Sequence, residues 1–329
     1  MIEADQYRGT VSALAPDVER PLWSVMIPTH NCAQYLGATL RSVLDQDPGP
    51  NLMQIEVVDD NSTQDDPAAV VRAVGQGRVG FFRQERNIGH VANFETCLNR
   101  TRGHLVHILH GDDRVRPGFY EKLGQAFELA PEIGAAFCRQ IFIDASDQTL
   151  SLSPLEETTA GTLPNALLRL AQEQRIMTPS IVVKRKVYER LGAFDRRLTC
   201  SEDWEMWVRI AANYPVWYEP EPLAQYRIHE ASSSARHQRT ADDMAYTRAA
   251  IKIFQAYLPE DLQPTAERHA RRVYAVAALV AAGHMLEKGD VFAFFAQLRE
   301  ALRFERSPGI LMRVARMLVR SGIGRLRHG

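Results

Sequence analysis

Cysteine is scarce in this sequence, and the four that occur lie far apart. None of them forms a C-x-x-C pair, so neither a zinc knuckle nor a disulfide framework is indicated. We expect small buried thiols in a reducing compartment. An excess of one charge sign is also missing: the formal net charge is −1, which gives no reason to expect nucleic acid as a partner. The four are Cys32, Cys97, Cys138 and Cys200.

Long apolar runs are absent as well. The most apolar stretch, Val273–Gly283, is far too short to cross a bilayer of roughly 30 Å. The first residues lack the basic and then apolar layout of a secretion signal, so we expect a cytoplasmic protein. No G-x-G-x-x-G follows a predicted strand, which disfavours a dehydrogenase that binds a dinucleotide.

The sequence does contain enough apolar material for a full core. Of its 329 residues, 45% are apolar and 24% are charged, both close to the average of soluble globular proteins. We divide the chain into an N-terminal arm (1–22), a main domain (23–238) and a helical C-terminal region (239–329). The last boundary is placed where the strand patterns end and the pattern becomes wholly helical.

In the main domain, short apolar runs alternate with segments of helical spacing. This alternation predicts an α/β fold, with a mostly parallel sheet flanked by helices. The polar segment 146–161 is expected to be a loop, and residues 1–22 a loose arm. Strands are predicted at 23–27, 55–58, 79–83, 105–109, 135–138 and 180–183, and helices at 35–46, 65–74, 91–100, 119–129, 164–173, 186–191 and 202–213.

Four short segments carry acids or a histidine where this alternation would bring them together. Three of them place their acids just beyond an apolar run or at the start of a helical pattern. Because open sheets bind ligands at the carboxyl edge, this set could serve a nucleotide, a divalent metal and a catalytic base. The segments are 55–63, 109–113, 201–204 and 226–229.

A series of motifs runs through these segments and their neighbours. They are S-V-M-I-P-T-H-N (24–31), V-V-D-D-N-S-T (57–63), N-I-G (87–89) with Asn93, G-D-D (111–113), G-A-F-D (192–195), E-D-W (202–204) and Y-R-I-H (226–229). Over roughly residues 22–235 the series resembles family 2 glycosyltransferases. The resemblance implies the GT-A fold, with a Rossmann-like sheet, and sugar transfer with inversion from a nucleotide-sugar donor.

The resemblance also implies a role for each motif. Sugar transfer builds negative charge on the departing diphosphate, which a divalent cation can neutralise. Mn²⁺ or Mg²⁺ prefers oxygen ligands and Mn²⁺ also accepts imidazole, so the implied metal ligands are Asp112, Asp113 and His229. The implied nucleotide-binding residues are Pro28, Thr29, Asn31, Asp59, Asp60, Asn87, Gly89, Gly111 and Asp112.

Asp203 is the implied catalytic base, because a carboxylate within reach of the acceptor hydroxyl can accept its proton. Glu202 is expected to orient the loop or help bind the acceptor. The plainer interpretation is that both acids favour a helix N-terminus. His110, Gly192 and Trp204 are the expected donor or acceptor contacts.

Plainer interpretations stay open elsewhere too. Asp59 and Asp60 could form an ordinary turn, and His229 could be a buried structural histidine. One departure from the family matters more. The family's metal motif often reads D-x-D-D, and here His110 replaces the first acid. A histidine at that position could bond the ribose or the diphosphate, or could weaken metal binding.

The expected reaction transfers one sugar or a few, from a UDP-linked donor to a glycan or lipid-linked acceptor in cell-surface polysaccharide biosynthesis. UDP is favoured because an aspartate after the second strand can accept from the uracil N3–H. The Q-x-x-R-W segment of processive synthases is absent. A nucleotidyltransferase would normally carry a Gly-rich, basic phosphate loop, which P-T-H-N-C (28–32) does not provide. An inactive member that only binds a glycan or nucleotide is the remaining hypothesis.

The segment 310–327 projects arginines on one side of a helical wheel and apolar residues on another. Such a helix can lie on anionic lipid, which would place the protein at the inner face of a membrane. It can equally pack its apolar side on the body. Helices at 246–257 and 270–286 could pack on the body or form a homodimer. The arginines are Arg313, Arg316, Arg320 and Arg327, and the apolar residues are Ile310, Leu311, Val314, Met317 and Leu318.

Overall fold

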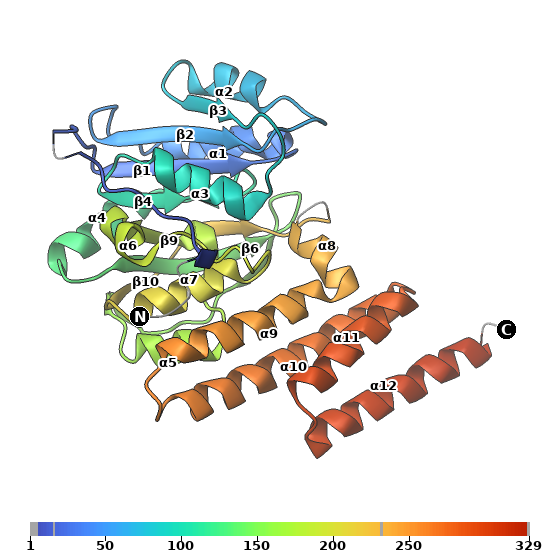
Figure 1. Cartoon of the computed structure of the whole chain (residues 1–329). Helices are drawn as coiled ribbons and strands as arrows, with labels where there is room; N and C mark the ends of the chain where they lie inside the picture. Colours follow the sequence, from blue (N-terminus) through green and yellow to red (C-terminus); the bar gives the residue numbers. More distant parts are fainter. Residues whose placement is uncertain (1–5, 16, 231–232, 328–329) are drawn as a thin grey trace. The chain divides into compact units, whose positions relative to one another are not determined.

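The structure, a computed structural model, describes residues 6–15, 17–230 and 233–327. The chain divides into two compact units, one of residues up to 166 with 174–228, and one of 167–173 with 229–329. The first unit is α/β and the second is helical (Figure 1). Helix α8 (Ser233–Thr240) contacts other helices of the second unit. The units therefore separate at residue 228, upstream of the composition change near residue 238.

One mixed sheet forms the centre of the α/β unit, with strand order β3-β2-β1-β4-β9-β6-β10-β5. The strands are β1 (Trp23–Thr29), β2 (Met53–Asp59), β3 (Gly80–Arg83), β4 (Leu105–Ile108), β5 (Arg114–Val115), β6 (Ala135–Ile143), β9 (Ile181–Lys184) and β10 (Val216–Arg227). Strands β3, β2, β1 and β4 are parallel neighbours, and so are β6 and β10. Strands β9 and β5 run antiparallel to their neighbours, and the other six strands of this order run in one direction, so the sheet is mixed but mostly parallel, as predicted.

Helices cover both faces of this sheet (Figure 1). They are α1 (Ala33–Leu44), α2 (Pro67–Gly75) and α4 (Phe119–Leu129) on one face, and α3 (His90–Arg100), α6 (Arg185–Leu191) and α7 (Glu202–Ala211) on the other. The alternation of side chains along β1 decides the assignment. Val25 packs in one core cluster with Leu40 and Leu123, whereas its neighbour Met26 packs with Cys97 of α3.

Four of the described strands, β5 and β10 together with two short ones, lie where the sequence predicted none. Strand β10 is the longest in the sheet, yet Pro220 and Pro222 interrupt its pattern. The register of β10 against β6 shifts on either side of Pro222, as expected where a bulge accommodates a proline. Within the predicted loop, β7 (Thr149–Leu152) extends β6 as an antiparallel neighbour, and β8 (Gly161–Thr162) pairs with β10.

The N-terminal segment is not loose between residues 7 and 12. Val11 is buried, and the guanidinium of Arg185 donates to the carbonyl of Ser12. The carbonyl of Gly9 accepts from the backbone N–H of Ala193. This segment therefore packs against the turn that follows α6.

The helical unit contains α8, α9 (Asp242–Phe254), α10 (Gln263–Glu287), α11 (Val291–Phe304) and α12 (Pro308–Arg327), and most of α5 (Ala166–Gln172). In α12, Ile310 and Val314 are buried in this unit, so they are not available to lipid, while Leu311 and Leu318 are 48% and 41% exposed. The side chains of Arg320 and Arg327 lie outside the described part. Among the described helices, none has the length and apolarity needed to cross a membrane.

Candidate active site

Three turns meet where the strand order reverses between β1 and β4, a position that favours ligand binding in open α/β sheets. They follow the carboxyl ends of the parallel strands β1, β2 and β4. The backbone N–H of Asp60 donates to the carbonyl of Thr29 at 2.9 Å, and that of Gly111 donates to the carbonyl of Pro28 at 3.0 Å. The predicted nucleotide turn and the predicted metal turn are therefore bonded to one another through β1.

Both predicted nucleotide acids bind protein donors. Asp59 is fully buried and accepts from the backbone N–H and the hydroxyl of Ser62. The two carboxylate oxygens of Asp60 accept from the backbone N–H groups of Ile88 (2.7 Å) and Gly89 (3.0 Å). These bonds stabilise the turns, as expected if Asp59 and Asp60 form an ordinary turn. A carboxylate oxygen has a second lone pair, so a base contact from Asp60 stays a prediction.

Three polar side chains, those of His30, Asn31 and Asn87, lie near these acids. The side-chain oxygen of Asn31 accepts from the backbone N–H of Thr63 at 2.9 Å. His30 is exposed and lies within hydrogen-bonding distance of Asn31 (2.8 Å) and Asn87 (3.2 Å). This role of His30 could not be predicted from the sequence, because nothing in its spacing indicates that it bridges two predicted nucleotide-binding residues.

The turn after β4, residues 109–113, is named here the acidic loop. Glycine is required at position 111, because a Cβ there would lie 2.8 Å from Thr29 Oγ1 and 3.0 Å from Cys32 Sγ. The buried Thr39 hydroxyl of α1 lies 3.0 Å from the carbonyl of Gly111 and 2.7 Å from that of Asp113. Helix α1 therefore fixes the course of the acidic loop.

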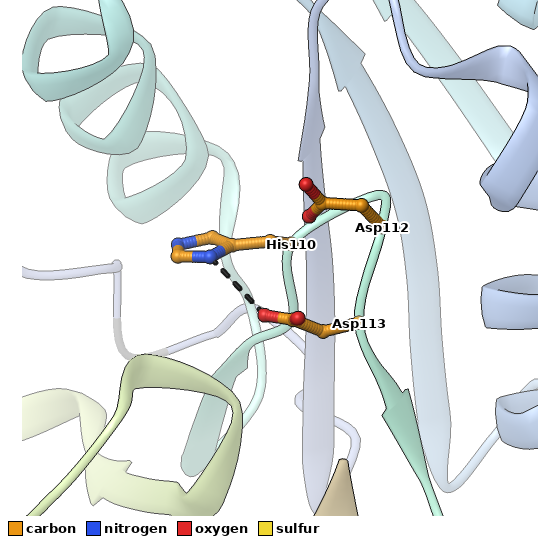
Figure 2. A group of neighbouring side chains, drawn as sticks. All are labelled: His110, Asp112 and Asp113. Carbon is orange, nitrogen blue, oxygen red and sulfur yellow. Dashed lines mark ion pairs between the residues drawn. The ribbon is translucent and has the colours of Figure 1, made fainter. Parts of the chain in front are cut away.

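The acidic loop brings His110, Asp112 and Asp113 together, as Figure 2 shows. Each offers one ligand atom, and these atoms lie within 4.8 Å of one another. In the described part of the chain, His110 Nε2 is buried without a hydrogen-bond partner. Carboxylate oxygens with an imidazole nitrogen are a donor set that Mn²⁺ accepts, so these residues fit a divalent cation.

His110 and Asp113 face each other in this cluster, with Nδ1 3.3 Å from the carboxylate (Figure 2). Burial disfavours the charged imidazole, but the hydrogen bond and charge of Asp113 outweigh it and raise the pKa of His110. Burial raises the pKa of Asp113. In its protonated form His110 carries a positive charge where the family's metal motif has its first acid, and only the neutral imidazole can ligate a cation.

Arg227, at the end of β10, forms hydrogen bonds with the acidic loop. It is buried, its backbone N–H donates to Asp113 Oδ1 at 2.8 Å, and its Nε donates to the carbonyl of Asp112 at 2.8 Å. Its sequence neighbour His229 belongs to the second compact unit. The role of His229 as a metal ligand stays a prediction.

The predicted base lies in the first turn of α7. Asp203 accepts from Gln174 Nε2 at 2.8 Å and lies 3.4 Å from the Thr178 hydroxyl. Burial of its carboxylate, and then the negative charge of Glu202, raise the pKa of Asp203 to about 7. A carboxylate tuned to this range can accept a proton near neutral pH.

Two predicted contact residues have other roles. Trp204 is a core residue with no exposed surface, so its side chain cannot contact a donor or acceptor, and that expectation was wrong. Gly192 has φ +77°, and a Cβ there would lie 3.2 Å from the carbonyl of Gly9. The packing of the N-terminal segment therefore explains this glycine, and a position under the donor sugar stays a prediction.

Together, the sheet with its strand-order reversal, the acidic loop and the ionisable Asp203 define a glycosyltransferase of the GT-A type. The sequence matches the family described as Glycosyl transferase family 2 over residues 24–192, and the chain belongs to that family. It is 28% identical to an uncharacterized glycosyltransferase of Methanocaldococcus jannaschii, over 64% of this chain and 72% of the relative.

Two further likenesses are informative. The succinoglycan biosynthesis protein ExoU of Rhizobium meliloti is 24% identical, over 76% of this chain and 74% of ExoU. The crystal structure of S. aureus TarS residues 1–349 in complex with UDP-GlcNAc superposes with a TM-score of 0.59 at 14% identity, covering 84% of this chain and 90% of that TarS fragment. At that identity the likeness to TarS shows the fold alone.

Proposed function

We propose that this glycosyltransferase moves a sugar from a UDP-linked donor to a hydroxyl of a glycan or lipid-linked acceptor, with inversion, in cell-surface polysaccharide biosynthesis. The observation that carries the proposal is the position of Asp203: its carboxylate is held by Gln174 in the first turn of α7, in the same compact unit as the acidic loop. TarS binds UDP-GlcNAc and ExoU serves succinoglycan biosynthesis, which supports the donor and the setting.

In this proposal each residue has one task. Asp203 accepts the proton of the acceptor hydroxyl as its oxygen attacks the anomeric carbon from the side opposite the diphosphate. Gln174 holds the carboxylate oxygen of Asp203 and so limits its rotation. The acidic loop would hold Mn²⁺ or Mg²⁺ through Asp112 and Asp113, and a bound ion supplies positive charge for the departing diphosphate.

Calorimetric titration with UDP, GDP, dTDP and CDP, with and without Mn²⁺, tests the donor and the metal together. We expect UDP to bind, and Mn²⁺ to tighten its binding at least about tenfold, because carboxylates and diphosphate oxygens share the cation. Tighter binding of another nucleotide would change the donor class. No binding of any nucleotide would support the hypothesis of an inactive member of the family.

His110→Asp is expected to raise the affinity of the acidic loop for Mn²⁺ at least about tenfold, because a further carboxylate increases the negative charge at the site. Isothermal titration with MnCl₂ measures the effect. His104→Asp is the matched control, since this exposed histidine precedes β4 at the opposite end of the strand. Equal affinities in His110→Asp and the unaltered protein would place the cation elsewhere.

A further inference from the structure

Glu202 is a buried carboxylate between α7 and α3, and its partner is a histidine that no motif indicated. Only 7% of Glu202 is exposed. Its Oε1 lies 3.2 Å from Nε2 of His90, and its Oε2 is buried with no hydrogen-bond partner among the described residues. Because a buried charge is costly unless it is paired, His90 is what allows Glu202 to be ionised beside Asp203.

His90 is held in place on two sides. It is the first residue of α3 and follows Gly89, whose backbone N–H donates to Asp60 at 3.0 Å. Its ring packs edge-on against Phe94 at 5.6 Å between centroids, and Phe94 stacks on His110 at 5.3 Å. The imidazole of His90 is therefore fixed between the nucleotide turn and the helix that carries the base.

We infer that His90 is a positioning residue of the transfer reaction: its pairing with Glu202 sets the placement and the charge environment of Asp203. This inference rests on the proposed function, in which Asp203 is the base. It assigns Glu202 to a network across the site, with α3 on one side and α7 on the other, instead of to the acceptor.

His90 and Glu202 each favour the charged form of the other. Burial disfavours a charged His90, but the hydrogen bond and charge of Glu202 outweigh it and raise the pKa of His90. Burial likewise opposes ionisation of Glu202, and His90 outweighs it, so the pKa of Glu202 is lowered. The charged groups that act on His90 are Glu202, His110 and Asp203. Those that act on Asp203 are Glu202 and His110, with Thr178 as a hydrogen-bond partner.

The test compares pH profiles of kcat/KM for the unaltered enzyme, His90→Gln and Glu202→Gln. Turnover is followed as nucleotide release from the UDP-sugar that binds, with water as acceptor. His90→Gln keeps a hydrogen-bond donor near the position of Nε2 but removes the charge. The negative charge of Glu202 is then uncompensated, so we expect the acidic limb to move to higher pH and kcat to fall about 10–100-fold. The KM of the donor should change less than about threefold.

Glu202→Gln removes the negative charge beside Asp203, so its acidic limb should move to lower pH, opposite to that of His90→Gln. In the double variant the limb should coincide with that of Glu202→Gln, because a neutral residue at position 202 leaves His90 no charge to compensate. A purely structural pair would lower activity without opposite shifts.

Coincident pH profiles for all variants would overturn the inference, as would equal losses in kcat and in donor binding. If His90→Gln does not fold, the downward shift expected of Glu202→Gln still decides. Failure of the proposed function is a separate result: the unaltered enzyme would then release no nucleotide from any UDP-sugar, whatever His90 does.

Discussion

Asp203→Asn is expected to lower the rate of sugar transfer about 1,000-fold, within the range that a positioned general base contributes. The amide cannot accept the proton of the acceptor hydroxyl, but it is nearly the same size as the carboxylate. Asp203 has no hydrogen bond to the nucleotide turns or to the acidic loop in the contacts described above. The affinity for UDP should therefore change less than about twofold. Single-turnover transfer and UDP titration measure the two quantities.

Glu121→Gln is the matched control. Glu121 is an exposed acid in the first turn of α4, so its loss removes a charge near a helix N-terminus without touching the site. Equal loss of transfer and of UDP affinity in Asp203→Asn would mean that Asp203 is structural. Transfer at the unaltered rate would place the base elsewhere.

The stability of Asp203→Asn separates the same two roles. Burial and the charge of Glu202 raise the pKa of Asp203 in the folded protein to about 7, above its value in the unfolded chain. The unfolded chain therefore loses this proton more readily than the folded protein, so the fold loses stability as the pH rises from the unfolded pKa to about 7, and the amide removes that cost. Above about pH 7 the variant should melt at the same temperature or higher. In the unaltered enzyme, transfer should fall as the pH drops through about 7, since only the ionised form accepts a proton.

The first half of the fold could be predicted because each of its strands and helices has a recognisable pattern within a short contiguous segment of the sequence. In β1, β2 and β4 every residue is buried and most are apolar, because both faces of the sheet are covered, and helices of ordinary spacing separate these strands. Strand β10 could not be predicted in this way. Its two prolines interrupt the run, and its place between β6 and β5 depends on pairing with residues far away in the sequence.

The same distinction holds at the site. The acidic loop and Asp203 belong to contiguous motifs, so sequence could indicate them. His90 acts through Glu202 and Arg227 acts through the acidic loop, and no spacing connects such distant segments. For Trp204, proximity in the sequence was misleading. It follows Asp203 directly, but consecutive residues on a helix point roughly 100° apart, so the base can face the site while the indole is buried in the core.

Asp112→Ala is expected to abolish the tightening of UDP binding by Mn²⁺. Asp112 lies on the acidic loop and is only partly buried, so its carboxylate can share a cation with a diphosphate. Loss of a direct ligand should cost transfer more than the roughly 10–100-fold that loss of an outer partner costs. Titration of the variant with UDP, with and without MnCl₂, measures the first effect, and the transfer assay measures the second.

Asp113 provides the sharpest comparison, because it is the neighbouring acid with different contacts. It is 1% exposed and accepts from the backbone N–H of Arg227, so Asp113→Ala leaves a buried donor unpaired at a cost of about 1–3 kcal/mol. In the absence of metal, Asp113→Ala should therefore melt lower than Asp112→Ala. If Mn²⁺ still tightens UDP binding in Asp112→Ala, then Asp112 is not the ligand. If both variants melt alike without metal, the proposed difference between the two acids is wrong, and Thr39 and the side chain of Arg227 are enough to hold the acidic loop in shape.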